Sequence, residues 1–475
     1  MKPRINIRQL ILFYGYYKRQ RFAEALAQIP MSTWCEFDHG IIACNKLGLH
    51  KMVAQSQGRG KNLESGIAMV ESLAKCGNSA AAKDALKQIR HRLRSRRLLV
   101  RLATNLAPVM PDVALELVDS DLASLPLRVA LQIRNNSSSN ADLLLKNTSD
   151  RDKHRFPELE LLMTNVNGGD SIQQLQRINR FLRSRKLSSV ALRSGDMPPG
   201  PTNFVGNPPN RVGVHNTPLV TVLITAYNAQ DRVGYSIESM LNQSWENLEI
   251  VVVDDCSEDE TATVIQEYER RDSRVRYLQL DKNLGTYVAK TEGLKIAKGD
   301  FITCHDADDW AHPLRIEVQI RPLLLYPNLV ATTSKWIRMR DDGTFYARPV
   351  YPLTRLNPAS PLFRRHPVED GPGLWDLVRT GADSEFLARL RLYFGTRAVK
   401  GLPFPLTFGS HRPDSLMTAS STGYDARGIS PTRQEYWESW NRWHIEQLNV
   451  GSKPRIPARG RVSTTIDVIR KPVTT

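Results

Sequence analysis

The chain lacks several features that would assign it to common protein classes. Its five cysteines form no CxxC pair, so we expect reduced thiols and no zinc site. No apolar run reaches the roughly 18 residues that a membrane-spanning helix requires. The apolar "LILFYGYY" near the start precedes the basic "KRQR" where a signal peptide would need a small-residue cleavage site. We therefore expect a cytoplasmic protein.

Glycine-rich phosphate loops are also missing. Neither GxGxxG nor a Walker A sequence occurs in the 475 residues. Such loops cradle the phosphates of dinucleotides and of nucleoside triphosphates. The sequence therefore argues against a dinucleotide enzyme, a P-loop ATPase and a sugar-nucleotide pyrophosphorylase.

Negative charge is scarce in the first part of the chain. Residues 1–200 contain 31 Lys and Arg against 17 Asp and Glu, which gives +14 of the total +16. A basic surface of this kind suits a polyanion such as nucleic acid, acidic lipid or an anionic glycan. The alternative is a solvated basic face with no specific partner. No stacking aromatics or recognisable reader motif accompany the charge, so we expect no nucleic-acid partner.

Residues 1–195 have the apolar spacing of helices. Segments such as "ESGIAMVESLAKCG" and "AAAKDALKQIRHRL" repeat apolar residues every three to four positions. The pattern predicts an all-helical, basic domain, similar to a helical-hairpin array but without a regular repeat. Residues 196–217 are rich in Pro, Gly and Asn, which predicts a linker.

The pattern changes after residue 217. Apolar, β-branched runs such as "LVTVLITAY" and "LEIVVVDD" alternate with helix-like segments up to "DFITCHD". This alternation predicts a mainly parallel sheet with helices on both faces. We assign this α/β domain to residues 218–450 and a basic, flexible tail to residues 451–475.

Acidic residues follow the predicted buried strands. Asp254 and Asp255 end one strand, and Asp306 and Asp308 follow another. The carboxyl ends of parallel strands meet at one sheet edge, where ligands bind. Clustered carboxylates repel one another, and a hard cation such as Mg²⁺ or Mn²⁺ would relieve the repulsion while keeping positions open for phosphate oxygens. The sequence therefore predicts a metal–diphosphate site.

The ordered motifs from about residue 218 to 421 resemble family 2 glycosyltransferases of the GT-A fold, in particular those of bacterial surface-polysaccharide synthesis. They include "VTVLITAYNAQDRVGYSIESMLNQSWENLEIVVVDDCSEDET", "NLGTYVAKTEGLKIAKGDFITCHDADDW" and "GADSEFLARL". The resemblance implies a transferase that takes a sugar from a nucleotide diphosphate donor, UDP-linked by expectation.

The resemblance also implies where the donor binds. Thr225 and Tyr227 match the contacts to the uracil end, and Asp255 matches the aspartate that accepts a hydrogen bond from the base. Lys290 stands where the family often has a basic residue near the donor, and the alternative is a surface lysine. Asp254 is expected to support its turn.

The "HDADD" segment matches the DxD motif of the family. The resemblance places Asp306 near the ribose and the metal, and it makes Asp308 the direct ligand of Mn²⁺ or Mg²⁺. Asp309 adds a further metal contact or caps the next helix. His411 and Arg412 lie where many members contact the metal or the diphosphate.

The catalytic base is expected in "GADSEF". Asp383 occupies the base position, although Ala382 replaces the acid that more usual sequences have beside it. Glu385 is the second choice. The implied reaction is a single displacement with inversion, in which the base takes a proton from an acceptor hydroxyl.

The acceptor is expected to be a glycan or a lipid-linked sugar, in capsule or exopolysaccharide synthesis. The helical region would then bind the acceptor, the inner membrane face or a polysaccharide-assembly protein. Two alternatives remain open at this point: a nucleotide-sugar-binding protein without catalysis, and a polyanion-binding protein that uses the basic N-terminal part.

Overall fold

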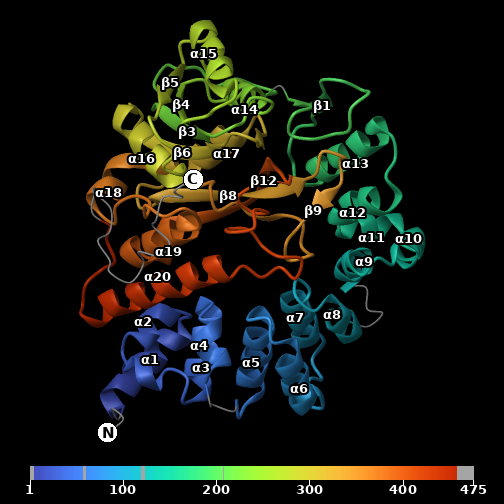
Figure 1. The fold of residues 1–475 in the computed structure, drawn as a ribbon, viewed down its shortest axis with the longest axis vertical. Coiled ribbons are helices and arrows are strands. Elements are labelled where there is room, and N and C mark those ends of the chain that lie inside the picture. Colours follow the sequence, from blue (N-terminus) through green and yellow to red (C-terminus); the bar gives the residue numbers. More distant parts are fainter. Residues whose placement is uncertain (1–4, 57–59, 119–123, 207, 414, 457–475) are drawn as a thin grey trace. The chain divides into compact units, whose positions relative to one another are not determined.

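The structure is a computed structural model that describes residues 5–56, 60–118, 124–206, 208–413 and 415–456. The chain divides into two compact units (Figure 1). The first unit contains the described residues of 1–141, 348–351 and 414–454, and the second contains those of 142–347, 352–413 and 455–475. No helix within the described ranges has the length and apolar character needed to cross a bilayer.

The first unit is helical. Its elements are α1 (Ile7–Lys18), α2 (Phe22–Leu26), η1 (Met31–Thr33), α3 (Asp38–Leu47), α4 (His50–Ala54), α5 (Leu63–Lys75), α6 (Ser79–Arg90), α7 (Arg96–Leu106), α8 (Pro111–Leu117), α9 (Leu125–Arg134) and α20 (Pro431–Asn449). Asn side chains cap three of these helices by accepting backbone N–H bonds, as Asn62 does from Ser65 at the start of α5. Helix α10 (Ser138–Lys146) spans the division between the units.

The second unit combines three further helices with an α/β domain. The helices before its sheet are α11 (Asp150–Arg155), α12 (Glu158–Asn167) and α13 (Ser171–Ser184). Those of the α/β domain are α14 (Val233–Leu241), α15 (Thr261–Arg271), α16 (Thr286–Ile296), α17 (Arg315–Leu325), α18 (Arg365–Asp370), α19 (Ala382–Phe394) and η3 (Thr396–Ala398).

The main sheet is mixed. Its strand order is β5-β4-β3-β6-β11-β8-β12-β7, and β9 and β10 also pair with β8. The strands are β3 (Val220–Ala226), β4 (Leu248–Asp254), β5 (Val275–Gln279), β6 (Phe301–Asp306), β7 (Trp310–Ala311), β8 (Ala331–Met339), β9 (Phe345–Tyr346), β10 (Arg355–Leu356), β11 (Leu362–Arg364) and β12 (Val399–Ser410). Strands β3 to β6 are mutually parallel, and β11 is antiparallel to both β6 and β8. The predicted alternation of strands and helices is therefore confirmed for residues 219–306.

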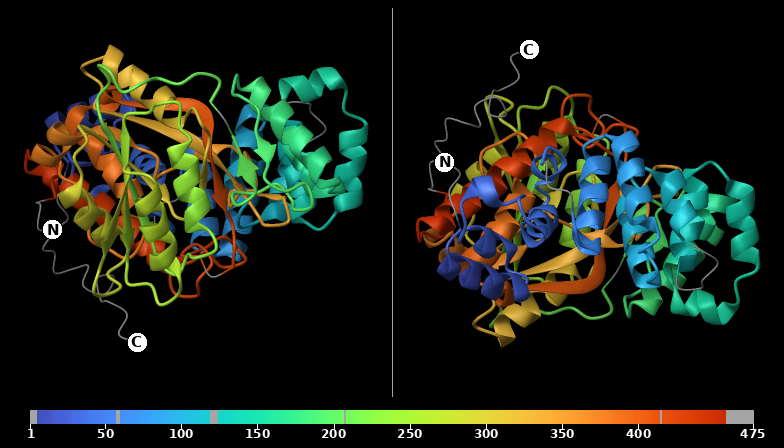
Figure 2. Two further views of the ribbon diagram at one scale, coloured as in Figure 1. Left: turned by 90° about the horizontal axis from the view of Figure 1, so that it is seen from above. Right: turned by 90° about the horizontal axis from the view of Figure 1, so that it is seen from below.

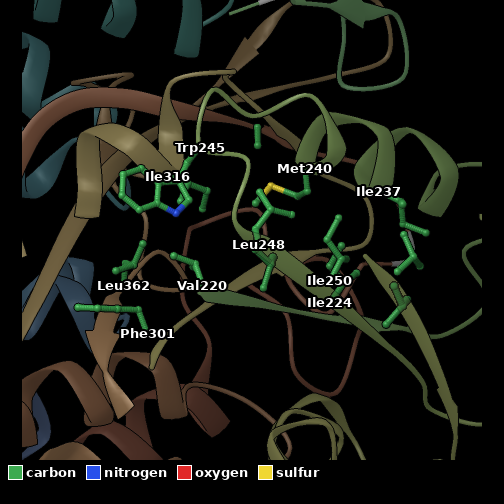
Figure 3. Close-up of a cluster of buried hydrophobic side chains, with 14 of the residues drawn as sticks. Val220, Ile224, Ile237, Met240, Trp245, Leu248, Ile250, Phe301, Ile316 and Leu362 are labelled. Atoms are coloured by element: carbon green, nitrogen blue, oxygen red, sulfur yellow. The ribbon is translucent and has the colours of Figure 1, made fainter. Parts of the chain in front are cut away.

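Helices cover both faces of the parallel strands (Figure 2). On one face, alternate residues of β3, such as Val220 and Ile224, pack with Ile237 of α14 and Ile316 of α17 (Figure 3). On the other face α16 lies so close that a Cβ on Gly293 would stand 2.7 Å from a methyl of Val253. This burial on both faces explains the nearly continuous apolar strands in the sequence.

The predicted linker of residues 196–217 contains ordered structure instead. A short hairpin joins β1 (Ala191–Leu192) to β2 (Phe204–Val205). Phe204 is buried against Trp310 and Phe408, with ring centroids 5.4 and 4.9 Å away. Pro and Gly residues lie in the turns of this segment, and Phe204 packs it against the sheet domain.

The division of the chain also differs from the predicted boundary at residue 195. Helices α11–α13 belong to the second unit, where Glu158 accepts backbone N–H bonds from Leu353 and Thr354 at 2.8 and 3.1 Å. Helix α20, expected in the sheet domain, belongs to the first unit. There Glu438 accepts the Lys51 N–H bond at 2.6 Å. Of the predicted tail, residues 457–475 lie outside the described residues.

Candidate active site

The carboxyl ends of β3, β4 and β6 bring the predicted residues to one sheet edge. In register, Thr225 lies opposite Asp306, and Ala226 lies opposite Asp254. The Thr225 hydroxyl is 2.7 Å from the Thr286 hydroxyl at the start of α16. Tyr227 is 45 % exposed directly after β3. Its ring is therefore available to stack on a planar ligand, as expected for a contact with a nucleobase.

Asp254 and Asp255 hold the loops beside this edge. Asp254 is buried and accepts bonds from both the N–H and the hydroxyl of Ser257, which confirms its expected support of the turn. Asp255 accepts backbone N–H bonds from Leu284 and Gly285, both at 2.7 Å. Burial raises the pKa of Asp255. The structure thus gives Asp255 a loop-holding role, and its predicted contact with the base would be additional.

Three carboxylates gather at the end of β6. Burial raises the pKa of Asp306, and the charges of Asp308 and Asp383 raise it further. Burial, together with the charges of Asp308 and Asp306, holds the pKa of Asp309 well above its usual range. The like-charge repulsion expected from the sequence is therefore present.

The three carboxylates differ in their suitability for a cation. Asp309 is buried and accepts the Ser410 N–H bond at 2.9 Å, which links the turn to β12. Asp306 and Asp308 are partly exposed, and Arg412 Nε lies 3.1 Å from Asp308 Oδ2. Within the described ranges no three His, Cys, Asp or Glu side chains form a ready metal-binding group. Two accessible carboxylates fit a hard cation that takes its other ligands from diphosphate and water.

Asp383 lies in the first turn of α19, and two side chains of α16 hold it. Its carboxylate accepts the Tyr287 hydroxyl at 2.9 Å and lies 3.2 Å from Lys290 Nζ. The Tyr287 hydroxyl in turn accepts the N–H of Asp383 at 3.3 Å. The Asp383 side chain is 17 % exposed and lies close enough to Asp306 to perturb its pKa. The base position and the acidic strand end therefore belong to one site.

Lys290 is a buried ammonium group rather than a surface lysine. Its side chain is 1 % exposed, with Nζ 5.0 Å from the ring of Tyr287 and 5.7 Å from that of Trp375. Burial alone would lower the pKa of Lys290, but the charge of Asp383 and those of its other neighbours raise it overall. Lys290 therefore remains charged and paired with Asp383.

Glu385 has a different environment from Asp383. It is fully buried, and its two carboxylate oxygens bind Arg389 at 2.8 and 2.9 Å. Arg389 also donates to the backbone carbonyls of Pro372 and Gly373. Glu385 thus stabilises the start of α19, and this placement does not favour it as the alternative base.

His411 and Arg412 follow β12, next to the acidic cluster. The ring of His411 stacks on Tyr346, with centroids 3.6 Å apart and planes 4° from parallel. Burial, with the charges of Arg338 and Arg340, lowers the pKa of His411 to about 4. The imidazole is therefore neutral at physiological pH, a form that suits contact with a metal or a hydrogen bond to phosphate. Arg412 reaches Asp308 directly.

Several residues of the site were not singled out from the sequence. Tyr287 precedes Lys290 by three positions on α16, and this helical spacing could have indicated that they share a face. Trp375 offered no comparable signal. Arg232 also offered no signal in the sequence, although it binds the Ser410 hydroxyl at 3.1 Å and Asp341 at 2.7 Å. These contacts depend on tertiary structure.

Comparisons with known proteins agree with the motifs. Residues 221–375 match the model of Glycosyl transferase family 2. TuaG of Bacillus subtilis, named as a teichuronic acid biosynthesis glycosyltransferase, is 33 % identical over 127 residues, which are 27 % of this chain and 50 % of TuaG. The succinoglycan biosynthesis protein ExoO of Rhizobium meliloti is 39 % identical over 166 residues, 33 % of this chain and 46 % of ExoO. The chain thus spans about half the length of these curated relatives.

A solved structure also resembles the chain. The crystal structure of S. aureus TarS 1–349 in complex with UDP superposes with a TM-score of 0.34 and 18 % identity, and it covers 41 % of this chain and 61 % of TarS 1–349. Together with the ordered motifs and the strand topology, the family match identifies the domain. Residues 221–375 of the chain carry a domain of glycosyl transferase family 2.

Proposed function

We propose that the chain transfers a sugar from a nucleotide diphosphate donor, UDP-linked, to a hydroxyl group of a glycan or lipid-linked acceptor. One observation carries this proposal. The carboxylate of Asp383 is held by Tyr287 and Lys290 of α16, and it lies near enough to Asp306 that its charge raises the pKa of Asp306. A carboxylate opposite a diphosphate-binding edge is the arrangement that a direct glycosyl transfer needs.

Asp383 acts as the general base in this proposal. It takes the proton of the acceptor hydroxyl, whose oxygen forms a bond to the anomeric carbon of the sugar as the bond to the diphosphate breaks. Lys290 and Tyr287 fix the carboxylate, so that it meets the hydroxyl in one orientation. A single displacement of this kind inverts the anomeric centre.

The nucleotide lies at the ends of β3 and β4. Tyr227 stacks on the base, and Thr225 contacts its edge or the adjoining ribose. Asp255 keeps the loop at Leu284 and Gly285 in place by accepting their N–H bonds. It also accepts a hydrogen bond from the nucleobase. The backbone of Gly285 has a φ of 90°, which other residues rarely adopt, so this loop shape depends on glycine.

Asp306 and Asp308 would hold Mn²⁺ or Mg²⁺, which would neutralise charge on the departing diphosphate. The protein's own cations act at the same place. Arg412 lies beside Asp308 and contributes positive charge near the phosphates. Neutral His411, fixed by its stack on Tyr346, donates or accepts a hydrogen bond there without adding charge.

The relatives support a place in polysaccharide assembly. TuaG and ExoO are named for the synthesis of teichuronic acid and of succinoglycan, respectively. We accordingly propose that this chain adds a sugar to a bacterial surface polysaccharide or to its lipid-linked precursor.

The proposal is tested by incubating the full chain with a panel of nucleotide sugars and measuring release of the nucleoside diphosphate, with and without Mn²⁺. Release from at least one UDP-sugar, rather than from GDP- or dTDP-sugars, is expected. Binding of nucleotide sugars without turnover of any would support the non-catalytic alternative. A salt-sensitive DNA shift with no nucleotide-sugar binding would support the polyanion-binding alternative.

A further inference from the structure

The outer face of α1 carries apolar side chains that no other described part of the chain covers. Ile7 is 78 % exposed, Ile11 is 67 % exposed and Leu12 is 41 % exposed. Ile7 and Ile11 are one helical turn apart on one face, and Leu12 follows Ile11 about 100° further around the helix. Ile7 has the highest exposed fraction among the exposed large hydrophobic residues of the described chain. Such a group on a protein surface marks an interaction site.

The inner face of the same helix is firmly packed. Phe13 is fully buried, with its ring 5.2 Å from that of Phe37 and 5.7 Å from that of Tyr17. A capping box at Asn6 and Gln9 closes the N-terminal end of the helix. Figure 1 shows α1 beside α2 and α3 in the first unit. The apolar outer face is therefore held on a formed helix and is not part of a core.

The charged residues in the sequence around α1 are of one sign. Residues 1–23 contain six Lys and Arg and no Asp or Glu. Arg8, Lys18 and Arg19 are exposed on or next to α1. The first acidic residue, Glu24, binds Arg21 at 2.8 Å. Within residues 1–23, the exposed apolar side chains are thus accompanied by cations and by no acidic residue.

We propose that α1 is a docking helix for an anionic membrane surface. Ile7, Ile11 and Leu12 enter the boundary between headgroups and acyl chains, and the flanking cations contact acidic headgroups. A helix that presents apolar residues between basic ones binds lipid in this way, because burial of apolar area and electrostatic attraction add. The helix lies on the membrane and does not cross it.

Charge favours lipid over a second copy of the chain. Two copies that met through α1 would bring together two segments that each carry six positive charges. An anionic surface instead pairs with each of them. Membrane docking does not depend on the proposed transferase activity, although it would place the enzyme where lipid-linked acceptors reside.

The experiment is sedimentation of the full chain with vesicles of phosphatidylcholine alone and of phosphatidylcholine mixed with phosphatidylglycerol. Binding to the mixed vesicles is expected, with little binding to the neutral ones and a loss at high salt. The double variant Ile7→Asp/Ile11→Asp should weaken binding at least about tenfold. Arg8→Glu/Lys18→Glu should weaken it as well.

The matched control is Leu143→Asp/Ile172→Asp, which places the same charge at two exposed apolar positions, 59 % and 62 % exposed, outside α1. This control should bind like the wild type. Equal binding by all variants, or no binding to anionic vesicles, would overturn the proposal. An oligomer in solution that dissociates only in the Ile7→Asp/Ile11→Asp variant would assign the face to a second copy and overturn it too. Release of nucleoside diphosphate, measured on each variant, reports the proposed function separately.

Discussion

The ammonium group of Lys290 lies 3.2 Å from the carboxylate of Asp383, although the two residues are 93 positions apart in the chain. Tyr287 completes the contact from the same helix face. The carboxylate of Asp383 is thus held in one orientation, and α16, which packs against β3 and β4, links these strands to α19. The proposed catalysis depends on this link as much as on the carboxylate itself.

Lys290→Met should slow transfer about 10- to 100-fold, because Asp383 loses the partner that fixes its position. Affinity for UDP should change little, since the proposed contacts to the nucleobase come from the ends of β3 and β4. Transfer rates and UDP titration on the same preparation measure both quantities. Lys295→Met, on the same helix but 64 % exposed in its side chain, is the control. Equal losses in the two variants would contradict the positioning role.

Asp308→Asn should reduce activity at least about 100-fold, and excess EDTA should do the same reversibly on addition of Mn²⁺. The carboxylate is one of two partly exposed acids at the strand end. Asp300→Asn makes the same change at the other end of β6, where the residue is exposed, and it should leave activity intact. Full turnover in EDTA would rule out the metal site.

Glu158→Ala should lower the free energy of unfolding of the second unit by about 2–4 kcal/mol. The substitution leaves the buried N–H groups of Leu353 and Thr354 without their acceptor. Glu160→Ala, on the same helix as Glu158, removes a partly exposed ion pair with Arg180 of α13 and should cost less than about 1 kcal/mol. Thermal unfolding of both variants checks the difference. A similar, small shift in both would mean that α12 is not integral to the unit.

His312 should make the second unit less stable in acid. Its Nδ1 accepts the Leu314 N–H bond and its Nε2 lies 3.1 Å from the Ser188 carbonyl, so the folded ring is neutral. Burial lowers its pKa to about 4, below the unfolded value near 6.5. The unfolded state therefore binds a proton that the folded state does not, and stability falls by up to about 1.4 kcal/mol per unit as the pH drops from 6.5 to 4.

His312→Asn tests this pH dependence. Asn retains an acceptor near the Leu314 N–H group but has no group that titrates in this range. The variant should be less stable at pH 8, with a shallower loss of stability towards pH 4. Urea unfolding of both proteins across this pH range gives the two slopes. Parallel slopes would mean that other groups account for the acid sensitivity.

The sequence predicts the parallel half of the sheet, β3 to β6, because its signals are local. Buried parallel strands read as continuous apolar runs, and the residues after each strand must meet at one edge. This reasoning brings Thr225, Asp254 and Asp306 together, as the structure does. The metal preference and the base assignment of Asp383 remain predictions.

The sequence does not predict the side-chain contacts that join the remaining distant segments. The pairing of Lys290 with Asp383 depends on how α19 returns to α16. The membership of α12 in the second unit depends on Glu158, which binds backbone almost 200 positions later. Residues 196–217 look like a linker by composition, yet Phe204 attaches them to the domain. The amino-acid composition of a segment does not indicate which residues one of its aromatic side chains packs against.

The central claim is that Asp383 is the base and not part of the nucleotide site. Asp383→Asn is nearly isosteric, and the amide oxygen can still accept from Tyr287. The measurement is the transfer rate and the UDP affinity of this one variant. The account predicts a rate lower by about 10²- to 10⁴-fold with UDP affinity unchanged. A near-normal rate, or a loss of UDP affinity that accounts for the lower rate, would contradict it.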